Sequence, residues 1–265
     1  MMTRPGRELM NSGCPVLALH SLGLDGSEFE RLQLYVGPQW TITGFDQLGH
    51  GMRASRHARD LDDYVADARR MLTALPSGPV HLLGHSMGGA IAALLASVMT
   101  IEQPQRIASL TLIATPPMGT DSLRQRGQLA LSQGMMAVVD GTIERWFSGD
   151  EDPDSIAYAT RSLLAMEPGG FDRAWSALAS FPGYQELATH LPPTLCIAAD
   201  KDISTPPAAM QTIVDALAAA DRQSADSFEI VVGAGHMVPL TAAPRVAALA
   251  CGHWIKNSSG SYVGG

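Results

Sequence analysis

The chain has 265 residues, of which 46% are hydrophobic and 17% are charged, and its net charge is −8. This balance is typical of a globular protein and excludes an intrinsically disordered one. The negative charge gives no electrostatic footprint for nucleic acid or an anionic membrane surface, so we expect neither as a partner. The sequence predicts nothing about the oligomeric state.

Location is predicted from three features. No stretch reaches the roughly 18 apolar residues of a membrane span, and residues 1–13 lack the apolar core of a signal peptide. The three cysteines, Cys14, Cys196 and Cys251, are odd in number and widely spaced, and two of them lie in apolar runs. Reduced, buried thiols and a cytoplasmic location are therefore expected.

Short apolar runs alternate with helical patterns along most of the chain. Strands are predicted at 16–20, 40–45, 80–83, 109–114, 194–199 and 228–232, and helices at 28–36, 61–75, 87–99, 207–220 and 242–255. Ser27 is the expected N-cap of the first helix. Strands that are apolar on both faces indicate an α/β fold with a mostly parallel central sheet and helices on both faces.

The alternation lapses between residues 118 and 191, where helical stretches occur without a good strand. We expect this segment to be a helical lid inserted over the carboxyl ends of the strands, within a single domain of residues 1–265. Residues 257–265 are rich in Gly and Ser and are expected to form a flexible tail.

The run Gly84-His85-Ser86-Met87-Gly88 reads G-x-S-x-G between a predicted buried strand and a predicted helix. In this setting the serine is a candidate nucleophile on a sharp, strained turn, and the glycines allow strand and helix to approach closely. An incidental serine in a glycine-rich turn is the alternative, which the strand–turn–helix context disfavours.

A serine nucleophile needs a histidine base and a carboxylate that orients it, in the chain order Ser, Asp or Glu, His. His236 follows the last predicted strand, whereas the other seven histidines are interpreted as structural or neighbouring residues. Asp202 and Asp200 both follow the 194–199 strand, and either could be the acid. Backbone N–H groups of Met87 and Leu22 are predicted to form the oxyanion hole.

With these residues in place, the chain resembles the α/β-hydrolase superfamily over nearly its whole length. Within it, the chain is most similar to the 3-oxoadipate enol-lactone hydrolases. The similarity rests on four segments: 21–25 (SLGLD), 84–89 (GHSMGG), lid positions Gly119-Thr120, Arg126, Gly134-Met135 and 144–147 (ERWF), and the acid strand with Asp202 and 205–207 (TPP). The last match implies Asp202, rather than Asp200, as the acid.

Four departures from that family stand out. His20 replaces the usual Asn, Leu48 replaces the Arg of a D-x-R-G-H-G turn, and Ala199 replaces a Gly. The N-terminal hairpin is shortened to a stub within residues 1–9. These departures imply a pocket and a substrate that could differ from those of the family.

The resemblance implies a serine hydrolase that opens a small enol-lactone or ester through an acyl-enzyme, with no metal and no cofactor. Such a lactone bears a carboxylate, so Arg126 and Arg145 are candidate substrate-binding residues, each equally interpretable as a solvated lid charge. Trp146 is predicted to wall the pocket, or else to pack the lid against the core. Three alternatives remain: a general carboxylesterase, an esterase with perhydrolase activity, and a non-catalytic small-molecule receptor.

Overall fold

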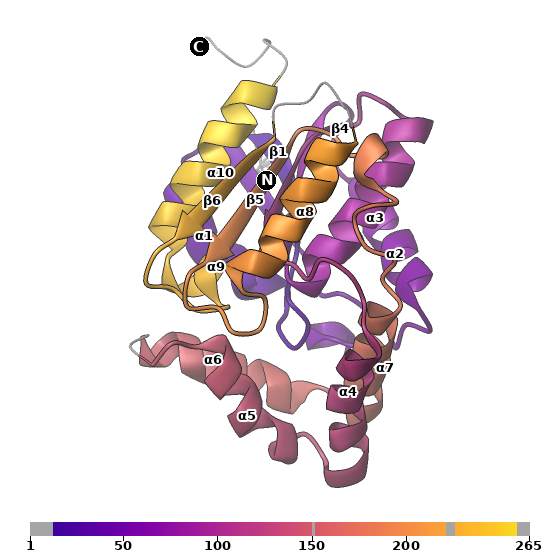
Figure 1. The fold of residues 1–265 in the computed structure, drawn as a ribbon, viewed down its shortest axis with the longest axis vertical. Helices are drawn as coiled ribbons and strands as arrows, with labels where there is room; N and C mark the ends of the chain where they lie inside the picture. Colours follow the sequence, from indigo (N-terminus) through magenta and orange to yellow (C-terminus); the bar gives the residue numbers. More distant parts are fainter. Residues whose placement is uncertain (1–12, 150–151, 221–225, 259–265) are drawn as a thin grey trace, which may run out of the picture.

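A six-stranded parallel sheet forms the centre of the molecule. The structure is a computed structural model that describes residues 13–149, 152–220 and 226–258. Within them the strand order is β2-β1-β3-β4-β5-β6, with every neighbouring pair parallel (Figure 1). The strands are β1 Cys14–Leu19, β2 Trp40–Gly44, β3 Val80–His85, β4 Ile107–Ile113, β5 Thr194–Ala199 and β6 Ser227–Val231. The parallel central sheet expected from the sequence is confirmed.

Helices cover both faces of this sheet. One face carries α1 Glu30–Val36 and α10 Ala243–Asn257, and the other carries α2 Leu61–Ala74, α3 Met87–Glu102 and α8 Pro207–Ala219. Residues of β3 alternate between the two sides, since Leu82 belongs to the core under α3 and Leu83 to the core under α10. Two buried cores therefore sandwich the sheet, as a strand's period of two residues requires.

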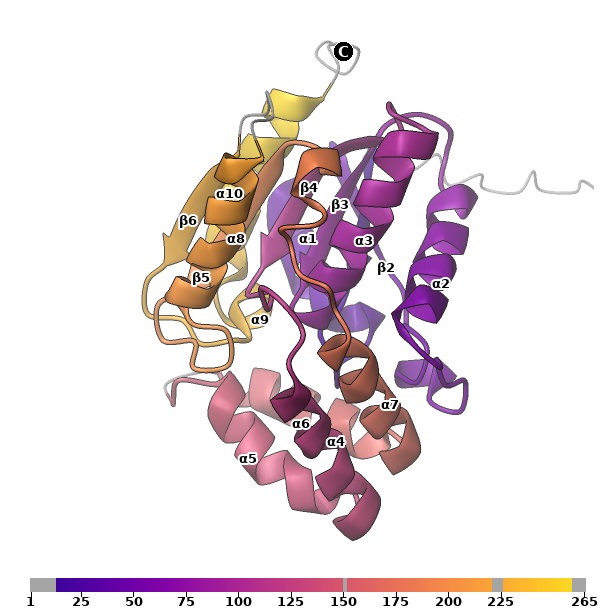
Figure 2. The same ribbon diagram turned by 45° about the vertical axis from the view of Figure 1, so that its right-hand side comes forward.

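In the described part of the chain, four α-helices lie between β4 and β5: α4 Asp121–Gln133, α5 Met136–Trp146, α6 Pro153–Ala165 and α7 Pro168–Ala179. They form a layer at one end of the sheet, beneath the loops that follow the strands (Figures 1 and 2). We call residues 118–191 the insertion. It lies at the carboxyl ends of the strands, and its role as a lid stays a prediction.

The start of the first helix differs from the prediction. A 3₁₀ helix, η1 Gly26–Phe29, precedes α1, and the side chain of Asp25 caps it by accepting from the backbone N–H of Ser27 at 3.0 Å. Ser27 is therefore the capped residue rather than the cap. An acceptor carboxylate two residues ahead competes well with a hydroxyl for this role.

The predictions for the two chain ends and for the cysteines can be compared with the structure only in part. α10 runs to Asn257, so the predicted tail begins one residue too early, and residues 259–265 lie outside the described residues. The stub of the N-terminal hairpin, within residues 1–9, also lies outside them. Of the cysteines, Cys14 and Cys196 are buried, whereas Cys251 is half-buried.

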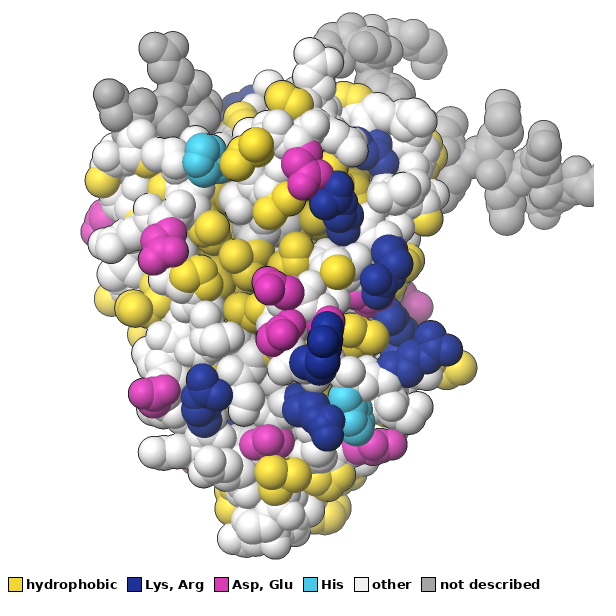
Figure 3. Space-filling view, turned by 90° about the vertical axis from the view of Figure 1, so that its right-hand side faces the viewer, with side chains coloured by type: hydrophobic (Ala, Val, Ile, Leu, Met, Phe, Trp, Pro, Cys, Tyr) yellow, Lys and Arg dark blue, Asp and Glu magenta, His cyan; other side chains and the backbone are white. Residues whose placement is uncertain are grey.

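The surface shows no single-sign stripe on the face drawn in Figure 3, where basic and acidic side chains are interspersed. Two arginines of α2 illustrate this mixing, because Arg69 pairs with Glu102 and Arg70 pairs with Asp67. Among the described residues, no helix combines the length and apolar character needed to cross a bilayer.

Candidate active site

Ser86 lies at the end of β3 in a backbone conformation that residues other than glycine rarely adopt, with φ 53° and ψ −119°. The neighbouring glycines make this turn possible. A Cβ on Gly84 would lie 2.4 Å from the carbonyl oxygen of Gly88, and one on Gly88 would lie 2.1 Å from that of Leu19. The sharp turn thus depends on these glycines and presents the Ser86 hydroxyl at the N-terminus of α3.

A hydrogen-bonded chain joins Ser86, His236 and Asp202. Nε2 of His236 lies 3.1 Å from Oγ of Ser86, and Nδ1 lies 2.7 Å from Oδ2 of Asp202. Since a carboxylate accepts, Nδ1 carries a proton and Nε2 is left to accept one from the serine. His236 and Asp202 are each only 2% exposed. The arrangement can therefore remove the Ser86 proton while the imidazolium is stabilised away from water.

Asp202 and Asp200 have different partners. The second carboxylate oxygen of Asp202 accepts from the backbone N–H groups of Ser204 and Thr205 at 2.7 and 2.9 Å. Asp200 accepts from the backbone N–H of Gly233 at 2.6 Å. The structure thus brings Asp202 to the imidazole, whereas Asp200 ties two loops together.

The two amides expected to bind an oxyanion lie beside the serine. The residues that carry them are buried, with exposures of 2% for Leu22 and 0% for Met87. Among the described residues neither amide has a hydrogen-bond acceptor. Buried N–H groups without an acceptor are rare, so a ligand oxygen is a fitting partner here.

A cavity of about 30 Å³ opens above Ser86. The cavity is narrow in this structure. Loops after the strands form one side of it and the insertion forms the other. Its walls are Ser21, Leu22, Ser86, Pro116, Leu123, Arg126, Trp146, Trp175, Leu178, Ser204, Thr205 and His236.

The chain matches the Alpha/beta hydrolase family over residues 16–249. It belongs to that family. This α/β-hydrolase is 28% identical over 256 residues to Lipase LipV of Mycobacterium tuberculosis, which covers 88% of this chain and 90% of the relative.

Two solved structures share the fold of this α/β-hydrolase. The enol-lactonase from Burkholderia xenovorans LB400 superposes with a TM-score of 0.79 at 20% identity, covering 92% of both chains. A thermophilic esterase from Thermogutta terrifontis has a TM-score of 0.76 at 22% identity, covering 92% of this chain and 90% of that one.

The three predicted substrate-binding residues of this α/β-hydrolase occupy different environments. Arg126 lines the cavity with its guanidinium 4.8 Å from the centre of the Trp175 ring. Trp146 also lines the cavity, and it is 4% exposed and part of the main core, so it walls and packs at once. Arg145 is not a wall residue, and its guanidinium donates to Oγ1 of Thr142 at 3.0 Å.

Burial lowers the pKa of both arginines, and the charge of Arg126 lowers the pKa of Arg145 further. Among the described residues Arg126 has no carboxylate partner. Arg126 is therefore a half-buried positive charge in the cavity wall, whereas Arg145 is half-buried outside that wall.

Sequence reasoning missed one buried pair of this α/β-hydrolase. Glu28 and His85 are both 0% exposed, and Oε1 of Glu28 contacts Nδ1 of His85. His85 was interpreted as a structural or neighbouring residue, and Glu28 as the start of the helix predicted at 28–36. The sequence signal that could have found this pair is the position of Glu28 next to Phe29, which is also buried in the short helix η1.

No group of three or more His, Cys, Asp or Glu side chains in the described part of the chain is placed to hold a metal ion.

Proposed function

We propose that this α/β-hydrolase cleaves small carboxylic esters or lactones through an acyl-enzyme formed on Ser86. The observation that carries the proposal is the hydrogen-bonded chain from Ser86 through His236 to Asp202 beneath a cavity. Esterase and lipase names among the relatives support the same class of reaction.

In the acylation step, the oxygen of Ser86 attacks the substrate carbonyl while Nε2 of His236 accepts the serine proton. The amides of Leu22 and Met87 hold the oxyanion of the tetrahedral intermediate. Collapse breaks the bond between the acyl carbon and the leaving oxygen, which takes the proton from His236. Asp202 holds the imidazole tautomer throughout.

Deacylation repeats this sequence with water. His236 removes a proton from a water molecule that attacks the acyl carbon, and Ser86 leaves with that proton. In a lactone the leaving oxygen remains attached to the acyl chain, so one acyl-enzyme carries the whole substrate. An enol leaving group would ketonise after release, which favours ring opening.

We further propose a substrate that bears a carboxylate, as an enol-lactone of this type does. Arg126 supports this, because it lies in the cavity wall without a carboxylate partner among the described residues. Without a cationic partner, desolvating a substrate carboxylate beneath the insertion would cost several kcal/mol of binding free energy.

The test is a panel of lactones and p-nitrophenyl esters of different acyl length, assayed with the wild type and Ser86→Ala. The variant should lose about 10⁴–10⁶ in kcat, as other serine triads do. Ser97→Ala on the same helix is the matched control, since Ser97 donates to the carbonyl of Leu94 away from the site. Fluorophosphonate labelling, located by mass spectrometry, should fall on Ser86.

The alternatives predict different patterns on this panel. A general carboxylesterase would hydrolyse neutral esters at least as fast as carboxylate-bearing lactones. A non-catalytic receptor would bind ligands without turnover, and Ser86→Ala would then leave every signal unchanged. Ser86→Ala activity within tenfold of the wild type would refute the assignment of the nucleophile.

A further inference from the structure

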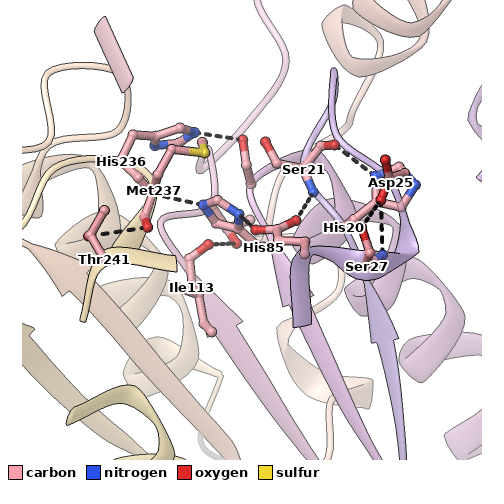
Figure 4. A network of polar contacts seen from close by, with 12 residues as sticks. His20, Ser21, Asp25, Ser27, His85, Ile113, His236, Met237 and Thr241 are labelled. Carbon is pink, nitrogen blue, oxygen red and sulfur yellow. Dashed lines mark hydrogen bonds and ion pairs between the residues drawn. The ribbon is translucent and has the colours of Figure 1, made fainter. Parts of the chain in front are cut away.

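One buried carboxylate connects the two loops that carry the proposed reacting groups. Oε2 of Glu28 accepts from the backbone N–H of Ser21 at 2.9 Å, next to the proposed oxyanion donor Leu22. Oε1 of the same carboxylate pairs with Nδ1 of His85. Glu28 therefore contacts both the loop that carries Ser21 and Leu22 and the residue before the nucleophile. Figure 4 labels Ser21, His85 and His236 in this network.

His85 continues the connection to the histidine loop. Its Nε2 lies 2.9 Å from the carbonyl oxygen of His236. Because a carbonyl oxygen only accepts, Nε2 of His85 donates this hydrogen bond. The two imidazole rings are 5.1 Å apart between centroids. The contact sequence thus runs from Ser21 through Glu28 and His85 to the backbone of His236.

Every polar atom of this connection has a partner within the protein. The carboxylate makes two contacts and the imidazole makes two, although both residues are 0% exposed. A buried polar group that loses its partner costs about 1–3 kcal/mol, so the four groups hold one another in place. His20 adds to this on the far side of Ser21, because its Nδ1 lies 2.8 Å from the Ser21 carbonyl oxygen.

We propose that Glu28 is a positioning residue that acts through His85 to align the oxyanion amide of Leu22 with the imidazole of His236. The inference rests on the proposed function, since it concerns the same site. Donors displaced by a few tenths of an ångström lose transition-state stabilisation while substrate binding changes little, so the effect belongs in kcat rather than KM.

Two substitutions at Glu28 separate hydrogen bonding from mere space filling. Glu28→Gln can keep every contact, with its oxygen facing Ser21 and its amino group donating to a neutral His85. Glu28→Met fills the same volume and breaks both contacts. We expect Glu28→Met to lower kcat at least 100-fold with KM changed less than threefold, and Glu28→Gln to stay within fivefold of the wild type.

A double variant guards against simple unfolding. Glu28→Met combined with His85→Phe replaces both partners by apolar groups, which leaves no unpaired buried polar group at either position and should recover thermal stability. We expect kcat of this stable variant to remain at least 30-fold low. Ser109→Ala is the matched control for a lost buried hydrogen bond, because it removes a 2.7 Å contact with His81 far from the site. It should change kcat less than twofold.

A readout independent of turnover separates this inference from the proposed function. The low-field proton resonance of His236 Nδ1–H, assigned with His236→Gln, should be unchanged in Glu28→Gln and displaced in the double variant. Failure of the wild type to hydrolyse the panel would refute the proposed function, and this resonance would still decide the connection. Recovery of kcat in the double variant, an equal loss in Glu28→Gln and Glu28→Met, or an unmoved resonance would overturn the inference.

Discussion

Asp200 and Asp202 lie two residues apart, but only the carboxylate of Asp202 contacts the imidazole of His236. Asp202→Asn should lower kcat by about 10³–10⁴, since an amide stabilises the wrong tautomer of His236. Asp200→Asn is the matched control and should stay within threefold, because an Asn oxygen can still accept from Gly233. Steady-state kinetics on one ester measures both, and the opposite ranking would move the acid to Asp200.

Arg126 is predicted to recognise the carboxylate of the substrate. Arg126→Met keeps apolar contact with Trp175 but removes the cation. KM for a carboxylate-bearing lactone should rise at least tenfold, about 1.4 kcal/mol, while a neutral ester of equal size is hydrolysed as before.

The control for Arg126 is Arg124→Met, an exposed arginine of the same helix. It should alter neither substrate. Equal losses on the charged and the neutral substrate in Arg126→Met would show that Arg126 only supports the insertion.

Sequence patterns predicted the nucleophile because its strand, turn and helix are contiguous, so local sterics fix the geometry. The choice of Asp202 over Asp200 came from family resemblance, since spacing alone does not say which carboxylate faces the imidazole. Glu28 was missed for the same reason. Its partners, His85 and the Ser21 amide, are distant in sequence or belong to the backbone, and only the tertiary fold brings them together.

At the scale of elements, α6 is fastened to the loop after β1. The hydroxyls of Tyr158 and Ser162 donate to the carboxylate of Asp25 at 2.9 and 3.3 Å, and Arg31 pairs with Asp152 at 2.7 Å. Burial alone would raise the pKa of Asp25, but hydrogen bonds from Ser27 and Tyr158 outweigh it and lower that pKa. These contacts hold the insertion against the narrow cavity.

Loosening this fastening should widen the range of substrates. Tyr158→Phe removes its hydrogen bond to Asp25 and should raise kcat/KM for p-nitrophenyl octanoate at least threefold. The acetate ester needs less space, so its rate should change less than twofold. Tyr35→Phe, on a tyrosine that is 50% exposed, is the control. A parallel fall on both esters would mean that Tyr158 aligns the site instead of restricting entry.

Two buried histidines lie in different parts of the molecule, His81 within β3 and His50 in the loop after β2. Burial, with a smaller contribution from His253, lowers the pKa of His81 to about 3. Burial and the charge of His20 likewise lower the pKa of His50 to about 3. In the unfolded chain these groups bind a proton below about pH 6.5, so the unfolded state binds more protons between pH 6.5 and 3. Folding stability is therefore greatest above pH 6.5 and decreases as the pH falls through this window.

Removing one such histidine should flatten the pH dependence of stability. From pH 6.5 to 5, each buried histidine costs about 2 kcal/mol of unfolding free energy, at about 1.4 kcal/mol per pH unit. In urea unfolding at pH 7 and pH 5, His81→Leu should therefore lose about 2 kcal/mol less than the wild type. Ser109→Ala removes the same hydrogen bond without the titrating group, so its slope should stay as in the wild type.

The contacts of Trp146 have a consequence for protein engineering. Its carbonyl oxygen accepts from the backbone N–H of Met237 at 3.2 Å, and a Cβ on Gly23 would lie 2.8 Å from its indole ring. The last turn of α5 thus lies against both the loop that carries His236 and Met237 and the loop that carries Leu22 and Gly23. A chimera that exchanges insertions between two hydrolases to transplant specificity should take this turn from the protein that supplies the sheet. The junctions of the exchanged segments should then lie on either side of the turn.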